Sequence, residues 1–170
     1  MQTELSLYPM PDFEKKICEP AHLMQRMLDL PRPLVFTNGC FDILHRGHVT
    51  YLAQARALGA ALVVALNTDA SVKRLGKGDD RPVNPLLNRA AVMASLGAVD
   101  LVTWFDEDTP FDLIELLKPE ILVKGGDWSI DAIVGSKETI SRGGVVHSIP
   151  FLFDTSTTKT LKKIRGKSSL

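Results

Sequence analysis

Five short apolar runs are spaced along the chain, and between them lie longer stretches in which apolar residues recur every three or four positions. The runs have the length and composition of buried strands and lie at 34–37, 61–67, 99–103, 120–124 and 145–149. The stretches with helical spacing lie at 20–30, 49–58, 85–96, 109–117 and 135–141, and a last one begins near 155–158. This alternation predicts an α/β fold, a doubly wound (Rossmann-like) parallel sheet of about five strands.

The same pattern divides the chain into parts. Residues 1–33 precede the first strand, and we expect an extension that is loose at first and then forms a short helix. Residues 34–166 form one domain, and 167–170 form a tail. Segment 71–84 is rich in glycine and charge and shows no apolar period, which predicts a loop.

This loop carries the basic residues Lys73, Arg74, Lys77 and Arg81. Most such clusters are solvated. This one follows the second predicted strand, which gives it another interpretation, as a loop that folds over an anionic ligand.

Composition and charge narrow the classes of function. The chain carries 20 Lys and Arg against 20 Asp and Glu, so no net charge attracts nucleic acid or an anionic membrane. It has no signal-peptide core and no apolar run of membrane-spanning length. Cys18 and Cys40 lack CxxC spacing and predict no disulfide framework. We therefore expect a cytoplasmic protein that binds neither nucleic acid nor membranes.

Candidate chemistry begins where the first strand ends. His45 and His48 lie three residues apart at the start of a helix, where free N–H groups and the helix dipole favour an anion. Both imidazoles can donate hydrogen bonds, and Gly47 between them lets a large group approach the backbone. The arrangement predicts a bound polyphosphate. The alternatives are a metal half-site, a zinc site that includes Cys40, and two unrelated surface histidines.

Other polar residues also follow strands. The basic loop follows the second strand, and residues 124–127 (KGGD) follow the fourth. Residues 156–158 (STT) begin the last helix, either as a plain cap or as donors to phosphate. Ligands of doubly wound sheets bind outside the carboxyl ends of the strands, so these features converge on one crevice. The sequence contains no P-loop, no GxGxxG after the first strand and no nucleophile elbow.

These residue types suit direct displacement at phosphorus, which needs positioned donors and cations more than covalent chemistry. His45 and His48 would donate to the nucleotide phosphates as charge builds up. Lys77 or Arg81 would reach the incoming phosphate or the leaving pyrophosphate. Mg²⁺ would be held mainly by the phosphates, so we expect no dedicated metal site in the protein.

The segment 37–42 (TNGCFD) followed by 45–48 (HRGH) resembles the signature of the HxGH nucleotidyltransferase superfamily. Further segments resemble one of its families, the D-glycero-β-D-manno-heptose 1-phosphate adenylyltransferases. These segments are 67–72, 81–84, 122–127, 143–144, 156–158 and 162–164. The resemblance covers nearly all of 34–165. It implies that ATP and the heptose 1-phosphate give ADP-heptose and pyrophosphate, with magnesium, for bacterial surface glycans such as the lipopolysaccharide core.

Together, the residues and the resemblance give a set of expected site residues. The expected catalytic residues are His45, His48 and Lys77. The expected nucleotide contacts are Thr37, Asn38, Gly39, Cys40, Phe41, His45, Gly47, His48, Arg89, Lys124, Gly126, Ser156, Thr157 and Thr158. The expected sugar-phosphate contacts are Asp42, Lys77, Arg81, Lys124, Asp127 and Trp128. Trp128 stands where the family has tyrosine, which keeps an aromatic face and changes any hydroxyl contact.

The resemblance also implies partners for this protein and leaves alternative functions open. Some family members are fused to a sugar kinase, for which this chain has no room, so we expect a separate kinase upstream. The superfamily suggests a homodimer. The alternative functions are cytidylyl transfer to a small phosphate such as glycerol 3-phosphate, and nucleotide binding by a regulator without catalysis. RNA binding by the basic residues after position 158 is disfavoured by the neutral charge balance and the lack of interleaved aromatics.

Overall fold

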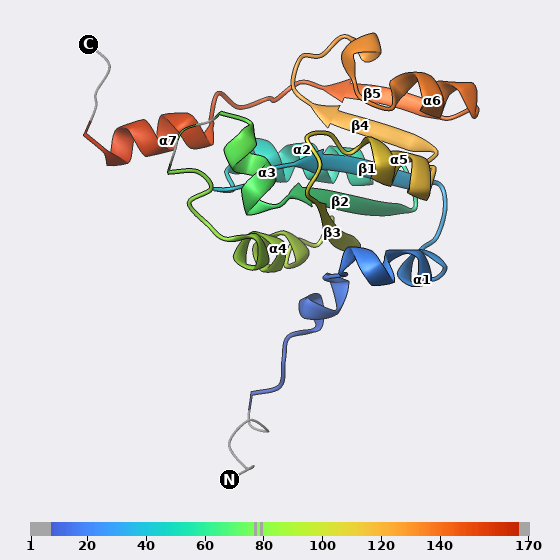
Figure 1. Ribbon diagram of the computed structural model, residues 1–170, viewed down its shortest axis with the longest axis horizontal. Coiled ribbons are helices and arrows are strands. Elements are labelled where there is room, and N and C mark those ends of the chain that lie inside the picture. The colour runs from blue at the N-terminus through green and yellow to red at the C-terminus, as the bar shows by residue number, and fades with distance from the viewer. Residues whose placement is uncertain (1–7, 77, 79, 167–170) are drawn as a thin grey trace.

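The computed structural model describes residues 8–76, 78 and 80–166. Five parallel strands form one sheet in the order β3-β2-β1-β4-β5 (Figure 1). Their bounds are β1 Leu34–Gly39, β2 Ala61–Asn67, β3 Leu101–Phe105, β4 Ile121–Gly125 and β5 Val145–Ile149. The predicted doubly wound sheet is confirmed. The strand order reverses at β1, which pairs with β2 on one side and β4 on the other.

Helices cover both faces of the sheet. The α-helices are α1 Leu23–Met27, α2 Arg46–Arg56, α3 Asp69–Arg74, α4 Leu86–Ala94, α5 Phe111–Leu117, α6 Ser136–Ser141 and α7 Thr157–Ile164. Short 3₁₀ helices are η1 Asp12–Lys16, η2 Pro20–His22 and η3 Ile130–Ala132. The strands point toward the side of the molecule on which α7 lies (Figure 1).

The alternation of side chains along β2 shows how the two layers are held. Its odd-numbered residues from Ala61 to Ala65 belong to a core that includes residues of α1 and α5. Its even-numbered residues from Leu62 to Leu66 belong to a second core with residues of α2 and α4. A central strand of a parallel sheet is buried on both faces, and this explains why β2 reads as a continuous apolar run.

The N-terminal extension has regular structure from η1 (Asp12–Lys16) onward and packs against β3, while Tyr8 and Met10 ahead of it are exposed. The Cys18 N–H donates to the Val102 carbonyl of β3 at 2.8 Å, and Ile17 forms a parallel bridge with Val102. Cys18 and Leu23 are buried in the core. The short turn η1 has too few apolar residues to show a helical period. Residues 1–7 lie outside the described part of the chain.

Part of the segment predicted as a loop is helical. Helix α3 includes residues 71–74, and it begins because the Thr68 hydroxyl accepts a hydrogen bond from the Ser71 N–H at 3.1 Å. Ser71 and Val72 are buried, whereas residues 73–76 are exposed. One and a half turns bury too few apolar residues for the sequence pattern to reveal them.

Arg89 of α4 is buried, and its guanidinium joins the ends of several elements. Nη1 donates to the Cys40 carbonyl at 2.8 Å, and Nη2 donates to the Asn67 carbonyl at 2.8 Å. Nη2 also donates to the Asp69 carboxylate at 2.6 Å, and Nε donates to the Asn84 carbonyl at 3.0 Å. Arg89 therefore fixes the carboxyl ends of β1 and β2 relative to α4.

A buried ion pair between Asp42 and Arg81 fixes the turn after β1. The Asp42 carboxylate accepts hydrogen bonds from Arg81 Nε at 2.5 Å and from the N–H groups of Val83 at 3.0 Å and Asn84 at 2.9 Å. The Asp42 side chain is 0% exposed and that of Arg81 7% exposed. Burial raises the pKa of Asp42, but the backbone N–H donors and Arg81 outweigh it and hold this pKa below its ordinary value.

Replacing Arg89 by methionine should lower the free energy of unfolding by about 3 kcal/mol or more, because the carbonyls and Asp69 lose their donors in a buried setting. Denaturant unfolding measures the loss. Arg142→Met is the matched control, since Arg142 pairs with Glu115 at the surface, and it should cost less than about 1 kcal/mol. Equal losses in the two variants would contradict this role of Arg89.

The stabilisation from Asp42 should depend on pH with a defined sign. Its folded pKa lies below the ordinary 3.8, so the carboxylate contributes stability above that pH, and the contribution is lost as the pH falls through the folded pKa. The wild type should therefore exceed Asp42→Asn in free energy of unfolding by a constant amount above about pH 5, and the gap should shrink below 3.8. Urea titrations across this pH range test the expectation, and a gap that stays constant would refute it.

Candidate functional site

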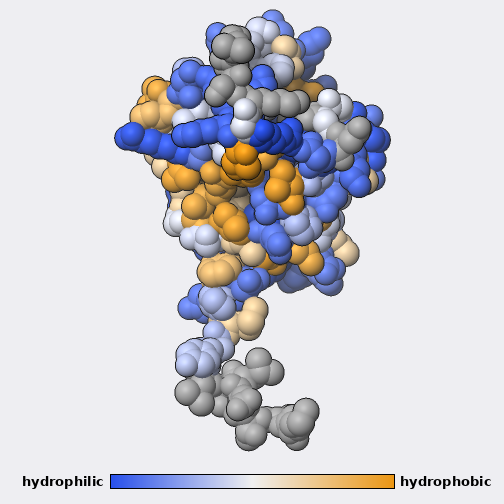
Figure 2. Space-filling view, turned by 90° about the vertical axis from the view of Figure 1, so that its left-hand side faces the viewer, coloured by the Kyte–Doolittle hydropathy of each residue, from blue (hydrophilic) through white to orange (hydrophobic). Residues whose placement is uncertain are grey.

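Two adjoining cavities lie at the carboxyl ends of the strands. Figure 2 looks at this side of the molecule, where hydrophilic side chains surround a central hydrophobic area. The larger cavity, which we call the histidine cavity, has a volume of about 530 Å³. It is lined by Asn38, Gly39, Cys40, Phe41, Asp42, His45, His48, Tyr51, Arg81, Lys124, Gly125, Trp128, Phe151, Thr155, Ser156, Thr157 and Thr158. The other, the second cavity, has a volume of about 210 Å³.

The two histidines are held in a defined geometry at the start of α2. His45 caps the helix, and its Nδ1 accepts a hydrogen bond from the His48 N–H at 3.4 Å. The Thr155 hydroxyl lies 3.1 Å from the same Nδ1. The imidazole rings stack, with centroids 3.7 Å apart. Burial lowers the pKa of His45, which favours the neutral ring.

The hydrogen bonds at Nδ1 of His45 also assign its tautomer. Because Nδ1 accepts a backbone N–H, the proton of the neutral ring lies on Nε2. Gly47 has no side chain to crowd this arrangement, since a Cβ there would lie 3.1 Å from His45 Nδ1. The neutral His45 therefore keeps one N–H donor, and that donor is on the nitrogen away from the helix cap.

Aromatic side chains support His48. Phe41 packs edge-on against it with ring centroids 5.1 Å apart, and Phe151 does the same at 6.0 Å. Tyr51 packs against Phe151, and its buried hydroxyl makes hydrogen bonds to the Thr37 hydroxyl and the Val123 carbonyl. Burial raises the pKa of Tyr51, so the phenol stays neutral.

A second helix N-terminus reaches the histidine cavity. Ser156 caps α7, and its hydroxyl accepts from the Lys159 N–H at 3.1 Å. The Thr157 hydroxyl donates to the Ile43 carbonyl at 3.1 Å, which ties the start of α7 to the loop after β1. Helices α2 and α7 thus both direct their N-terminal ends toward one cavity, an arrangement that favours an anion.

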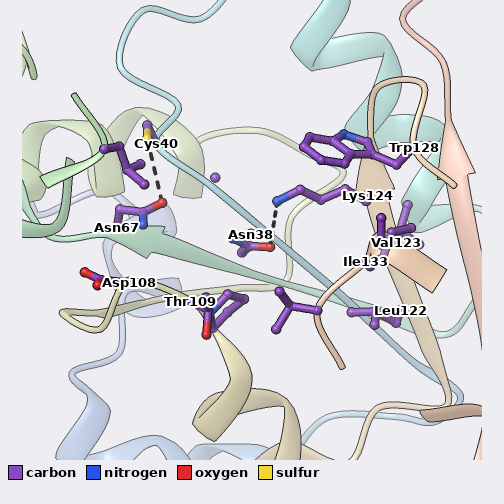
Figure 3. A pocket seen from close by; sticks show the side chains of 15 residues that line it. Asn38, Cys40, Asn67, Asp108, Thr109, Leu122, Val123, Lys124, Trp128 and Ile133 are labelled. Carbon is purple, nitrogen blue, oxygen red and sulfur yellow. Dashed lines mark hydrogen bonds between the residues drawn. The ribbon is translucent and has the colours of Figure 1, made fainter. Parts of the chain in front are cut away.

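The two cavities share one wall. Asn38, Gly39, Cys40, Lys124 and Trp128 line both of them. Lys124 Nζ donates to the Asn38 side-chain oxygen at 3.2 Å, which joins the ends of β4 and β1 (Figure 3). Trp128 is half-exposed, and its indole N–H donates to the Gly125 carbonyl at 3.2 Å. A group in one cavity can therefore reach a group in the other at this wall.

The structure brings most of the expected site residues together. Those that line the histidine cavity are Asn38, Gly39, Cys40, Phe41, Asp42, His45, His48, Arg81, Lys124, Trp128, Ser156, Thr157 and Thr158. Five others are described and line neither cavity, namely Thr37, Gly47, Arg89, Gly126 and Asp127. Lys77 lies outside the described residues.

Several of these positions have surroundings that differ from the expected roles. Asp42 and Arg81 bind each other, so Asp42 does not present an unoccupied carboxylate to a sugar. Arg89 donates to carbonyls below the site. Asp127 is exposed outside both cavities. Arg74, expected in a basic cluster, pairs with carboxylates of the β3–α5 loop.

Apart from Gly125, which belongs to the expected segment 124–127, three residues of the histidine cavity were not predicted from the sequence. Thr155 contacts His45, while Tyr51 and Phe151 support the aromatic wall. Thr155 directly precedes the expected hydroxyl motif, and its position was the one signal that pointed to it. Tyr51 and Phe151 read as ordinary apolar positions, because only the fold brings them beside His48.

Among the described residues, no three or more His, Cys, Asp or Glu side chains are grouped so that they could hold a metal ion, and the alternative zinc site of Cys40, His45 and His48 is not formed. In the same part of the chain, no helix has the length and apolar character needed to cross a bilayer.

Comparison with known proteins places this site in a family. The model of the Cytidylyltransferase-like family matches residues 36–166. D-beta-D-heptose 1-phosphate adenylyltransferase of Bordetella bronchiseptica is 58% identical over 155 residues, which cover 90% of this chain and 96% of that protein. Bifunctional protein HldE of Hahella chejuensis is 59% identical over 132 residues, which cover 78% of this chain. The matched region is only 28% of that bifunctional relative.

Solved structures agree on the fold. The lipopolysaccharide core biosynthesis protein of Thermoplasma volcanium is 29% identical with a TM-score of 0.58, over 69% of this chain and 94% of that one. Pantothenate synthetase of Thermus thermophilus is 16% identical with a TM-score of 0.62, over 89% of this chain and 70% of that one, and shows the fold alone. With its HxGH helix start, its doubly wound sheet and these relatives, the chain belongs to the cytidylyltransferase-like family and, within it, to the heptose 1-phosphate adenylyltransferases.

Proposed function

We propose that this protein transfers AMP from ATP to D-glycero-β-D-manno-heptose 1-phosphate, giving ADP-heptose and pyrophosphate for bacterial surface glycan synthesis. The observation that carries the proposal is the pair of cavities that share the wall of Asn38, Gly39, Cys40, Lys124 and Trp128. One cavity has the donors that a triphosphate needs, and the other has room for an acceptor beside it. The similarity to the Bordetella bronchiseptica enzyme supports the choice of substrates.

The reaction is a direct displacement. An oxygen of the sugar phosphate attacks the α-phosphorus of ATP, and the bond from that phosphorus to the bridging oxygen of the β-phosphate breaks as pyrophosphate leaves. The acceptor approaches from the second cavity, across the shared wall. The pyrophosphate remains in the histidine cavity, near the N-terminus of α7. This placement keeps the attacking and leaving oxygens on opposite sides of the reacting phosphorus.

The chain's own groups stabilise the charge that develops. His45 donates from Nε2, and His48 lies stacked beside it at the start of α2. The N-terminal N–H groups of α7 and the side chain of Thr158 face the leaving phosphates. Lys124 lies in the shared wall, where the charge of the attacking phosphate meets that of the nucleotide. Donors fixed before the reaction act without reorganisation, which is the largest source of catalysis in this type of site.

The roles of other expected residues follow from their contacts. Asp42 and Arg81 hold the turn after β1 against the loop before α4, and Arg89 holds the strand ends. These three act on the shape of the site. Mg²⁺ would arrive with ATP, held by phosphate oxygens, and would neutralise part of their charge. The donors of the histidine cavity fit such a ligand, because they are N–H and O–H groups that face its phosphates.

The substrates also define neighbouring steps. A sugar 1-phosphate must be supplied by a kinase that phosphorylates the anomeric hydroxyl, and we propose that a separate protein does so in the cytoplasm. The homodimer that the superfamily resemblance suggests stays a prediction.

The proposal is tested by pyrophosphate release, with ATP and CTP each combined with heptose 1-phosphate and glycerol 3-phosphate in the presence of Mg²⁺. Release of pyrophosphate is expected only for the pair of ATP and heptose 1-phosphate. Release with CTP and glycerol 3-phosphate would show the cytidylyl alternative. ATP binding without release from any pair would favour a regulator and overturn the proposal.

Replacing His48 by alanine should lower kcat about 10²- to 10³-fold, the scale for the loss of one preorganised donor. Steady-state kinetics measure the effect, and circular dichroism checks that the variant is folded. His22→Ala is the matched control, because His22 is exposed in η2 at a distance from the site. An activity of His48→Ala close to that of the control would exclude His48 from the reaction.

A further inference from the structure

The second cavity has opposite charges on its two sides. Figure 3 shows Lys124 and Trp128 on one side and Asp108 and Thr109 on the other. Lys124 belongs to the wall shared with the histidine cavity, whereas Asp108 and Thr109 belong to the loop between β3 and α5 and line the second cavity alone. A ligand that fits this cavity has an anionic group at one end and hydrogen-bond donors at the other.

The remaining lining is suited to a sugar body. Leu122, Val123 and Ile133 form an apolar wall, and Asn67 lies across from them (Figure 3). Asn67 is buried, and its side-chain NH₂ donates to the Ser71 hydroxyl at 3.0 Å, which holds the amide in place. Apolar walls pack against C–H groups, while a few placed polar groups fix orientation, as in most small-molecule sites.

Asp108 is held in position by a neighbour. Its Oδ1 accepts from Arg74 Nε at 2.9 Å, and the side chain is otherwise 75% exposed. A carboxylate offers about four acceptor positions, so the bond to Arg74 leaves it able to accept from hydroxyl groups. Asp106 pairs with the same Arg74 but does not line the second cavity. Asp106 and Asp108 therefore share Arg74 as a partner, but only Asp108 lines the second cavity.

We propose that Asp108 determines sugar specificity by accepting hydrogen bonds from the hydroxyls that lie farthest from the anomeric phosphate. This inference rests on the proposed function. The phosphate must lie at the wall of Lys124 to reach the nucleotide, so the sugar ring extends into the second cavity and its C6–C7 side chain ends near Asp108 and Thr109. The loop after β3 then recognises C7 and its hydroxyl, which a heptose has and a hexose lacks.

The test compares kcat/KM for D-glycero-β-D-manno-heptose 1-phosphate and for β-D-mannose 1-phosphate, which lacks C7. Wild type should prefer the heptose. Asp108→Asn should raise KM for the heptose about 10-fold or more, the scale for a hydrogen bond to a charged group. It should also lower the ratio of kcat/KM for the heptose phosphate to kcat/KM for the mannose phosphate by a similar factor. The KM for ATP should stay unchanged.

Asp106→Asn is the matched control, since it removes a carboxylate from the same loop and the same arginine. It should leave the heptose-to-mannose ratio at the wild-type value. The inference is overturned if both variants change the ratio equally, or if Asp108→Asn weakens both sugars to the same extent. In either case wild-type turnover of the heptose leaves the proposed function intact. A wild type that turns over neither sugar overturns the proposed function and, with it, this inference.

Discussion

The buried guanidinium of Arg89 organises the part of the fold on which the site depends. It donates to carbonyls at the ends of β1 and β2 and before α4, three segments that hydrogen bonds of the sheet alone do not align. A buried charge is costly unless it is fully hydrogen-bonded, and here Asp69 supplies the compensating charge. The ends of parallel strands have carbonyls without partners, and Arg89 satisfies them while it fixes their spacing.

As a consequence, buried contacts beneath the cavities determine the shape of the site. Asp42 and Arg81 form a similar charged contact closer to the site, and it holds the turn after β1 in place. With the turn fixed, His45 caps α2 and the stacked histidines keep one orientation. Charge stabilisation at phosphorus is effective only when donors are in place before charge develops. Buried arginines that hold strand ends and turns therefore contribute to the proposed catalysis through geometry.

The sequence revealed those features that depend on local pattern. Apolar runs predicted all five strands, and the spacing of His45 and His48 after the first strand pointed to the cavity that both histidines line. Roles that depend on distant contacts were not readable. Asp42 and Arg89 are polar residues within site motifs, and only the fold shows that each faces another part of the chain. Helix α3 and turn η1 are too short to show a periodic spacing of apolar residues. The roles of Thr155, Tyr51 and Phe151 are visible only in the folded chain, where these residues lie around the histidines.

Charge in this protein is arranged by pairing. Arg74, Arg81 and Arg89 each bind a carboxylate, which accounts for much of the basic character that the sequence shows around the site. In the proposed function, attraction for phosphates would arise from two helix N-termini, the histidines and Lys124, all of which line one cavity. Because these donors are short-ranged, in the proposed function they would distinguish a correctly placed triphosphate from other anions. A chain without net charge can in this way bind a highly charged substrate with no general affinity for polyanions.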